Sequence, residues 1–266
     1  MSQTRDDEVR QHVRNRYKQI VLESASTSSC CTPSSSETGC CGTPNEVSSK
    51  LGYSDEELAA VPLGSNLGLG CGNPQAIASL KPGEVVLDLG SGAGFDCFLA
   101  SKQVGESGKV YGVDMTPEMV SRARSNAQTN GYKNVEFRLG EIEHLPMPDN
   151  SVDVIISNCV INLSPDKPQV FREAFRVLKP GGRLAISDVV ATAEFPKEIK
   201  GDLNSLASCI SGASTVDEIS GMLNLSGFTD IVVELKDESR EFIKDWVPGA
   251  NIEDYTLSAV IKAIKP

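Results

Sequence analysis

Histidine is almost absent from this chain of 266 residues, which contains only two. His12 and His144 lie in no recognisable metal-ligand or catalytic-base motif, and His144, just before Leu145-Pro146, is predicted to lie in a surface loop. Chemistry at a hydroxyl oxygen needs a base or a metal to remove the proton. The sequence does not show that machinery, so we expect a reaction that does not begin with proton abstraction.

Long apolar runs and an excess of positive charge are also missing. No stretch reaches the roughly 18 apolar residues of a membrane-spanning helix, and the first residues have no apolar core of a signal peptide. The formal net charge is −11, whereas nucleic acids and anionic lipids require a basic surface. We therefore expect a soluble cytoplasmic protein with no nucleic-acid or membrane partner.

Cysteine, by contrast, occurs eight times. A reducing compartment disfavours a disulfide framework, so the cysteines are either reactive, metal-ligating or small buried apolar residues. Cys97 lies among apolar residues on an expected helix and is predicted to be a core residue. Two cysteine pairs, Cys30-Cys31 and Cys40-Cys41, match no standard zinc motif. A role in gathering or relaying a thiophilic ion is favoured for them over a structural metal site.

The pattern along the chain predicts three parts. Residues 1–50 combine a helix over 7–22 with a flexible arm rich in Ser and Cys. Residues 51–190 begin with a short helix over 54–60, capped by Ser54 with Glu57, and then alternate strands with helices. Residues 191–266 form a substrate-covering segment and two last strands.

The alternation after residue 84 predicts a mostly parallel sheet with helices on both faces. Five strands are expected at 85–89, 109–114, 135–139, 152–157 and 183–189, and two more at 231–235 and 256–264. The expected helices among these strands are one that follows Gly94 through residue 104, one opening at Thr116-Pro117, and those over 167–178, 197–211 and 215–225, with 179–182 as a turn.

A glycine-rich loop follows the first of these strands. Gly90, Ser91, Gly92 and Gly94 would let the backbone approach a ligand at the carboxyl end of the sheet, and Asp114, twenty residues past Gly94, could accept both hydroxyls of a ribose. The third glycine comes one residue too early for a dinucleotide fingerprint. Asp88 before the loop would repel a pyrophosphate but could meet an ammonium group. The loop therefore favours S-adenosylmethionine over NAD.

Three further cysteines lie on separate segments that could converge over such a cofactor. Cys71 lies in a second glycine stretch, Gly68–Pro74, which no strand precedes, so it is not a nucleotide loop. Cys159 follows the fourth strand, and Cys209 lies in the segment expected to cover the substrate. Thiolates select thiophilic centres, and trivalent arsenic bound by thiolates keeps a lone pair that needs no deprotonation. A thiophilic substrate would explain the missing base.

The motifs Asp88–Gly94, Asp114-Met115 and Leu178–Arg183 resemble those of the class I methyltransferases. The resemblance implies a Rossmann-like α/β fold with a doubly wound, mostly parallel seven-stranded sheet and S-adenosylmethionine as cofactor. Cofactor contacts would then extend to Ser91 and Met115. Glu141 would lie near the adenine with Ile142 beside the ring, and Asn158 and Cys159 would lie near the transferred methyl.

Over nearly its whole length the chain resembles the prokaryotic arsenite S-adenosylmethionine methyltransferases. The matching stretches are Val13–Tyr17, the Cys-Cys arm, Asn66–Pro74, Leu87–Asp96, Ser157–Pro165 and the Cys209 segment. This resemblance implies that Cys159 and Cys209 hold arsenic, with Cys71 as a third thiol. Cys41, or Cys40, would take part in thiol–disulfide exchange with a glutathione- or thioredoxin-like reductant. The substrate would be arsenite or its thiol conjugates, and the products methylated arsenicals and S-adenosylhomocysteine, in arsenic detoxification.

Two rival interpretations of the sequence stay open. The first is a small-molecule C- or N-methyltransferase in which the cysteines are incidental. The second is a thiol-based metalloid sensor or scavenger that keeps the fold without turnover; an intact Gly90–Gly94 loop and Asp114 weigh against it, since a sensor need not retain them.

Overall fold

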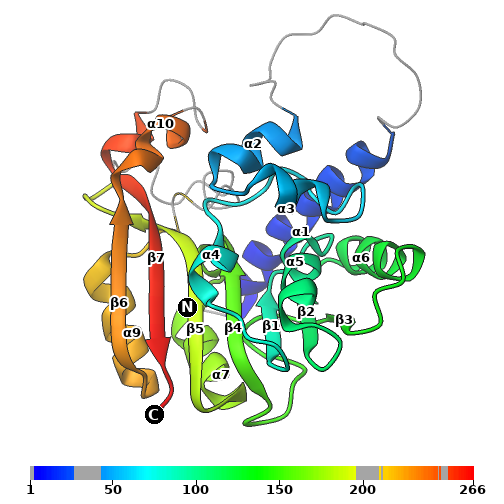
Figure 1. Cartoon of the computed structure of the whole chain (residues 1–266). Helices are drawn as coiled ribbons and strands as arrows, with labels where there is room; N and C mark the ends of the chain where they lie inside the picture. The colour runs from blue at the N-terminus through cyan, green and yellow to red at the C-terminus, as the bar shows by residue number, and fades with distance from the viewer. Residues whose placement is uncertain (1–2, 27–42, 196–209, 211, 245, 247–250) are drawn as a thin grey trace, which may run out of the picture.

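The computed structural model describes residues 3–26, 43–195, 210, 212–244, 246 and 251–266. Its centre is one seven-stranded sheet in the order β3-β2-β1-β4-β5-β7-β6 (Figure 1). The first five strands run parallel, and β7 pairs antiparallel with both β5 and β6. The strands are β1 (Val85–Leu89), β2 (Lys109–Asp114), β3 (Val135–Leu139), β4 (Val152–Asn158), β5 (Leu178–Ala191), β6 (Thr229–Lys236) and β7 (Thr256–Ile264). The predicted doubly wound, mostly parallel sheet is confirmed.

Helices cover both faces of this sheet because alternate residues of each buried strand point to opposite sides. Val86 packs with α5 and α6, whereas its neighbours Leu87 and Leu89 belong to the core beneath α7 and α9. Figure 1 shows α4 and α5 on one face and α7 and α9 on the other. The helices are α1 (Gln3–Ser26), α2 (Pro44–Lys50), α3 (Asp55–Ala59), α4 (Pro74–Ala78), α5 (Phe95–Val104), α6 (Pro117–Thr129), α7 (Lys167–Val177), α9 (Val216–Ser226) and α10 (Arg240–Ile243), with the short 3₁₀ helices η1 (Ile161–Leu163), η2 (Asp237–Ser239) and η3 (Ile252–Asp254).

Most element boundaries agree with the sequence patterns. Ser54 caps α3 and forms the expected capping box with Glu57, and Thr215 does the same for α9. Thr116 occupies the N-cap position of α6, but its side chain makes no capping hydrogen bond. The turn expected at 179–182 is instead an irregularity inside β5, since the register with β4 shifts between Val152 and Val154. The helix expected over 197–211 lies almost wholly outside the described residues.

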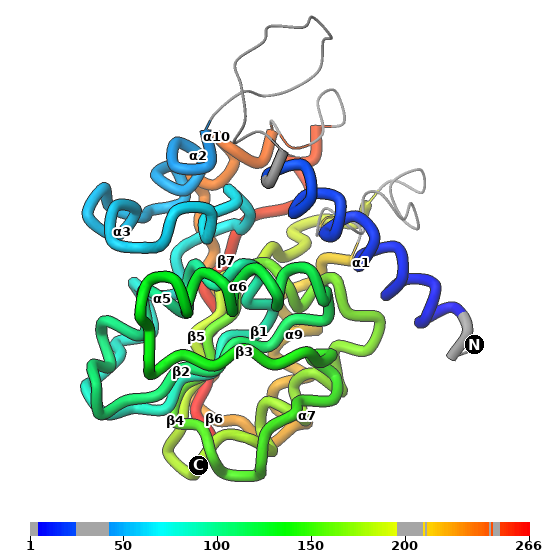
Figure 2. The backbone as a smooth tube through the Cα atoms, turned by 90° about the vertical axis from the view of Figure 1, so that its right-hand side faces the viewer, coloured from blue at the N-terminus to red at the C-terminus, as the bar shows by residue number. Residues whose placement is uncertain are grey.

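Helix α1 is longer than the helix expected over 7–22 and packs against α6 (Figure 2). Val9, Val13 and Val21 bury the inward face of α1. Arg10 forms ion pairs with Glu141 and Glu143, which follow β3. The helix is therefore held against the loop after β3 by both apolar packing and charge.

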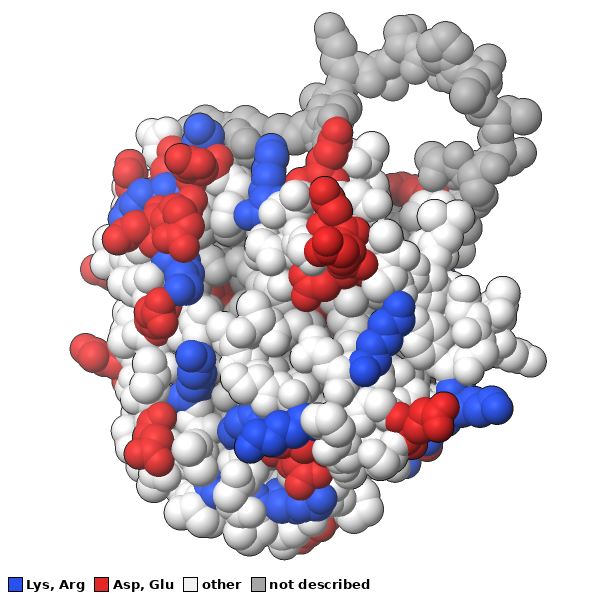
Figure 3. All heavy atoms as spheres, viewed as in Figure 1, with Lys and Arg blue, Asp and Glu red and all other residues white. Residues whose placement is uncertain are grey.

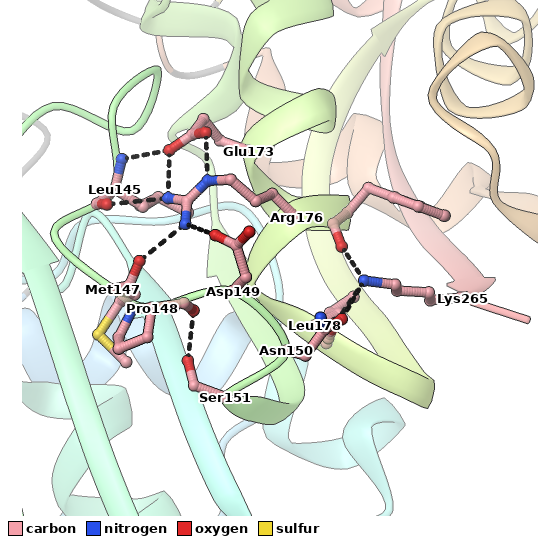
Figure 4. A network of polar contacts seen from close by, with 11 residues as sticks. Leu145, Met147, Pro148, Asp149, Asn150, Ser151, Glu173, Arg176, Leu178 and Lys265 are labelled. Carbon is pink, nitrogen blue, oxygen red and sulfur yellow. Dashed lines mark hydrogen bonds and ion pairs between the residues drawn. The ribbon is translucent and has the colours of Figure 1, made fainter.

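A polar network fixes the loop between β3 and β4 (Figure 4). The Arg176 guanidinium on α7 donates to the carbonyls of Leu145 and Met147 at 3.1 and 2.8 Å, and it pairs with Glu173 and Asp149. The Leu145 N–H donates to Glu173 at 2.8 Å. These bonds satisfy loop backbone groups that no strand can satisfy, and so hold the residues just after β3 in place.

The surface carries its charges unevenly. On the face drawn in Figure 3, acidic side chains gather over α3, whose first turn contains Asp55, Glu56 and Glu57, and blue side chains lie among red ones elsewhere. Among the described residues, no helix is both long and apolar enough to cross a membrane.

Candidate functional site

A cavity of about 340 Å³ opens at the carboxyl ends of β1, β2 and β4. Its walls come from the glycine loop after β1, the ends of β2 and β4, the loop after β3, the 65–70 segment and helix α1. This is the edge at which open parallel sheets bind ligands, because the strand ends and helix N-termini leave backbone groups there without partners. The only tryptophan, Trp246, also lines the cavity.

The glycine loop owes its shape to backbone angles that favour glycine. Gly90, Gly92 and Gly94 have φ values of 71°, 52° and 96°, which lie in the left-handed region. At Gly90 a Cβ would come within 2.3 Å of a Val160 methyl carbon, so this position has no room for a side chain. Gly90, Ser91 and Gly92 line the cavity. Gly94 does not; it is the N-cap of α5, beside the rings of Phe98 and Phe137.

Two buried carboxylates, Asp88 and Asp96, both line the cavity and are near enough to interact electrostatically. Burial raises the pKa of Asp88 well above its usual value, and the charge of Asp96 raises it further. Burial also raises the pKa of Asp96 to about 6, although the Tyr53 hydroxyl, which donates to Asp96 Oδ1 at 2.8 Å, opposes this. Within the described part of the chain no positive charge lowers the pKa of either acid, so a cationic ligand is favoured, because a positive charge would relieve both the desolvation and the repulsion.

Asp114 at the end of β2 and Ser91 in the loop complete the polar wall. Asp114 Oδ2 accepts from the Gly92 N–H at 2.9 Å and Oδ1 from the Thr116 N–H at 2.8 Å, which aims the carboxylate at the cavity while lone pairs remain on both oxygens. The Ser91 Oγ is buried, and none of the residues that the structure describes hydrogen-bonds to it; such a group usually has a ligand or a water as its partner. Met115 and Ile142 supply apolar surface beside them.

Asn158, at the end of β4, holds the loop that carries Cys71. Its Oδ1 accepts from the Cys71 N–H at 3.0 Å, and its Nδ2 donates to the Gly72 carbonyl at 2.8 Å and to the Tyr53 hydroxyl at 3.1 Å. Cys71 is buried and does not itself line the cavity, whereas Asn158 does. The side chain expected to contact the cofactor thus also positions the first cysteine.

Cys159 lies directly after Asn158 with a φ of 58°, an unfavourable angle for a residue with a Cβ. Its N–H donates to the Ser187 carbonyl at 2.8 Å, which helps to hold this geometry. The ligand atoms of Cys71, Cys159 and Asp188 all lie within 4.8 Å of one another. The structure therefore brings together two thiols from segments 88 residues apart in sequence, with a buried carboxylate beside them.

Asp188, near the carboxyl end of β5, which ends at Ala191, is a site residue that the sequence patterns did not predict. It accepts from the Ile161 and Val189 N–H groups and from Asn162, and burial raises its pKa to about 6 despite these bonds. An acid near the carboxyl end of a parallel strand beside β4 was a usable signal. Tyr53 and Asp96 were not predicted as site residues either: Asp96 is only the last residue of the Leu87–Asp96 motif, and nothing local marks Tyr53 as a partner of β4.

Of the remaining cysteines, only Cys97 lies within the described residues. Cys97 is buried in the core as expected, and its thiol donates to Asp88 Oδ2 at 3.3 Å. Burial and the charge of Asp88 raise its pKa well above the usual value, so it stays a thiol. The predictions for Cys209 and for Cys30, Cys31, Cys40 and Cys41 lie outside the described residues. Glu141 does not line the cavity; it pairs with Arg10 and Arg14 of α1.

The chain is similar to methyltransferases in a family model, in related sequences and in solved structures. Residues 80–227 match the family described as "Methyltransferase domain". The chain is 53% identical to an arsenite methyltransferase of Halobacterium salinarum over 98% of its own length and 67% of that protein's. It is 40% identical to an arsenite methyltransferase of Aquipseudomonas alcaligenes over 82% of its length, spanning 61% of that relative.

Among solved structures, an arsenic(III) S-adenosylmethionine methyltransferase from Chlamydomonas reinhardtii superposes with a TM-score of 0.63 at 35% identity. The match covers 84% of this chain and 75% of that one. The chain therefore spans about three fifths to three quarters of the length of these relatives.

Proposed function

The chain belongs to the arsenite methyltransferase family within the S-adenosylmethionine-dependent methyltransferases, and from that premise we propose that it methylates trivalent arsenic held by cysteine thiolates. The observation that carries the proposal is the position of two thiols. Cys71 and Cys159 come from remote loops, their sulfur atoms lie within 4.8 Å, and Cys159 lines the cavity of the glycine loop. Thiols so arranged favour a thiophilic substrate over an oxygen or nitrogen nucleophile.

The residues present fit S-adenosylmethionine, which supplies an electrophilic methyl group on a sulfonium when bound. Asp88 and Asp96 would hold its ammonium group, whose positive charge would compensate the buried negative charge of the two carboxylates. Asp114 would accept from the ribose hydroxyls. Met115 and Ile142 would flank the adenine, and the orphaned Ser91 Oγ would gain a partner.

Cys71 and Cys159 then bind arsenic by exchange. Each As–S bond forms as one arsenic hydroxyl leaves with the thiol proton as water, so the site needs no separate base. The lone pair on arsenic carries no proton, which is consistent with the near absence of histidine. Holding this lone pair in line with the methyl is worth about 7–11 kcal/mol in well-aligned systems. Cys209 would supply the third thiolate.

Methyl transfer leaves arsenic oxidised by two electrons, and its return to the trivalent state requires two thiols that form a disulfide. In the same proposal Cys41 or Cys40 takes part in that exchange, and a glutathione- or thioredoxin-like thiol in the cytoplasm restores it. Neutral arsenous acid is not repelled by a chain of net charge −11.

Serine variants of the two thiols test the proposal. Cys71→Ser and Cys159→Ser should each lower the rate of methylarsenical formation at least a hundredfold while S-adenosylhomocysteine binds as in wild type. Cys97→Ser is the matched control, because a serine hydroxyl can still donate to Asp88, and it should retain activity. Turnover retained in both site variants would refute thiolate binding, and tight arsenite binding without turnover in wild type would favour a scavenger.

A further inference from the structure

We propose that Tyr53 and Asn158 are positioning residues that transmit occupancy of the cofactor's ammonium subsite to the loop that carries Cys71. Cofactor and arsenical would then strengthen each other's binding. The effect of the cofactor on arsenical binding rests on the proposed function. The effect of the cofactor on the Cys71 loop does not, and it can be measured without arsenic.

A continuous path of hydrogen bonds links the two places. The Tyr53 hydroxyl donates to Asp96 Oδ1 at 2.8 Å and accepts from Asn158 Nδ2 at 3.1 Å. Asn158 in turn binds the Cys71 N–H and the Gly72 carbonyl at 3.0 and 2.8 Å. One buried hydroxyl thus joins a cavity carboxylate to the backbone on both sides of the Cys71–Gly72 peptide bond.

The Cys71 loop is packed closely against its neighbours, so a movement of the Asn158 side chain would also move the loop. A Cβ on Gly70 would come within 2.8 to 3.0 Å of three Asn158 side-chain atoms, and one on Gly72 within 2.9 Å of Ser187 Oγ. The Ser258 hydroxyl donates to the Cys71 carbonyl at 2.6 Å. Packing this close has discrete arrangements and does not deform continuously, so a rotated Asn158 amide would displace the loop.

Ligand binding supplies the reason for Asn158 to change state. With the ammonium subsite empty, burial and the charge of Asp96 disfavour the ionised form of Asp88, and burial likewise disfavours the ionised form of Asp96, so repulsion and desolvation both weaken the acceptor of the Tyr53 hydrogen bond. A bound ammonium group removes the repulsion and keeps Asp96 ionised. An ionised carboxylate accepts a stronger hydrogen bond from Tyr53, and this fixes the hydroxyl, the Asn158 amide and the loop in the observed arrangement.

Alkylation of Cys71 by N-ethylmaleimide, followed by mass spectrometry of its peptide, measures the loop directly. Cys71 is 1% exposed, so it reacts only when the loop opens. Saturating S-adenosylhomocysteine should slow labelling of wild type about tenfold, within the ~5–150-fold range of ordinary coupling between sites. Methylthioadenosine, which has the nucleoside but no ammonium group, should bind without slowing it.

Tyr53→Phe removes the hydroxyl and leaves the ring packed on Phe95, whose centroid lies 4.8 Å away. In this variant the protection by S-adenosylhomocysteine should fall to less than twofold. Tyr132→Phe is the matched control: its hydroxyl donates to the Ala60 carbonyl at 3.4 Å and lies outside the cavity, so protection should persist. Thermal unfolding confirms that both variants fold.

Tyr53→Phe and Tyr132→Phe also test whether the cofactor strengthens arsenical binding. The fluorescence of Trp246, which lines the cavity, reports that binding. Titration with phenylarsine oxide should give a dissociation constant about tenfold lower with S-adenosylhomocysteine in wild type and Tyr132→Phe, and a ratio near one in Tyr53→Phe. Asn158→Ala should also bring the ratio of the two dissociation constants near one. The double variant with Tyr53→Phe should show no further change in that ratio, because both residues act in one path.

Several outcomes would overturn the proposal. One is protection of Cys71 that persists in Tyr53→Phe, since the ligand would then shield the thiol directly. Others are equal protection by methylthioadenosine, equal loss in Tyr132→Phe, or no protection in wild type. A failure of the proposed function looks different: phenylarsine oxide would not bind, while protection of Cys71 would still depend on Tyr53.

Discussion

At Gly90 the chain leaves β1 with a φ of 71°, and a methyl group there would collide with Val160 at 2.3 Å. Gly131 has nearly the same φ, 72°, but open space around it. The two residues thus separate the cost of backbone strain from the cost of a collision beside the cavity.

Gly90→Ala is expected to lower the free energy of unfolding by about 2–4 kcal/mol, since backbone strain of about 1–3 kcal/mol adds to overpacking. It should also weaken S-adenosylhomocysteine binding at least tenfold. Gly131→Ala should lose about 1 kcal/mol and bind the ligand as wild type does. Urea denaturation and calorimetric titration check both; equal effects in the two variants would contradict the role given to Gly90.

At the scale of elements, α1 is one wall of the cavity, and ion pairs help to hold it there. Arg10 reaches Glu143, whose side chain is 5% exposed and whose carboxylate also accepts from the Ser164 hydroxyl at 2.7 Å. Arg14, one turn later, reaches Glu141, which is 34% exposed. Exposed ion pairs contribute roughly 0–1 kcal/mol, whereas a buried charge left without its partner costs several.

Arg10→Ala should therefore destabilise the protein by about 2–3 kcal/mol and weaken S-adenosylhomocysteine binding, since α1 lines the cavity. Arg14→Ala is the control and should cost under about 1 kcal/mol. Thermal unfolding and ligand titration measure both. Identical behaviour of the two variants would mean that the Glu143 contact does not hold α1 in place.

The elements were more predictable from the sequence than the contacts between them. Capping signals at Ser54 and Thr215 and the apolar strands depend on neighbouring residues, so local patterns located them. The bond between Tyr53 and Asn158, and the approach of Asp188 to the two thiols, join segments far apart in sequence. Only the assembled sheet brings such groups together, and the patterns on either segment do not reveal the pairing. The irregularity in β5 was missed for a similar reason, because β4 sets its register.

At the scale of the whole molecule, four buried carboxylates make stability depend on pH. Burial raises the pKa of Asp88, Asp96, Asp114 and Asp188, with Asp96 and Asp188 at about 6. A raised pKa means that the folded state binds protons more tightly than the unfolded chain, so stability is lost as pH rises through about 6. The hydrogen bonds from Arg176 lower the pKa of Glu173, and its contribution is lost as pH falls below that residue's usual value of 4.5.

The melting temperature of the ligand-free protein should therefore rise as pH falls from 8 to about 5 and decline again below about 4.5. Asp96→Asn should flatten the rise between pH 7 and 5, because it removes one of these acids. Stabilisation by S-adenosylhomocysteine should be larger at pH 7.5 than at pH 5, where Asp96 is protonated. Scanning calorimetry across pH measures all three; a melting temperature that rises steadily from pH 5 to 8 would contradict the assignment.

Arsenic K-edge X-ray absorption of the protein with arsenite tests the central claim, because it counts the sulfur neighbours of arsenic without requiring turnover. The account predicts three sulfur ligands in wild type and in Cys97→Ser, and one fewer in Cys71→Ser and in Cys159→Ser. Arsenic bound through oxygen alone, or a sulfur count that is the same in all four proteins, would contradict it.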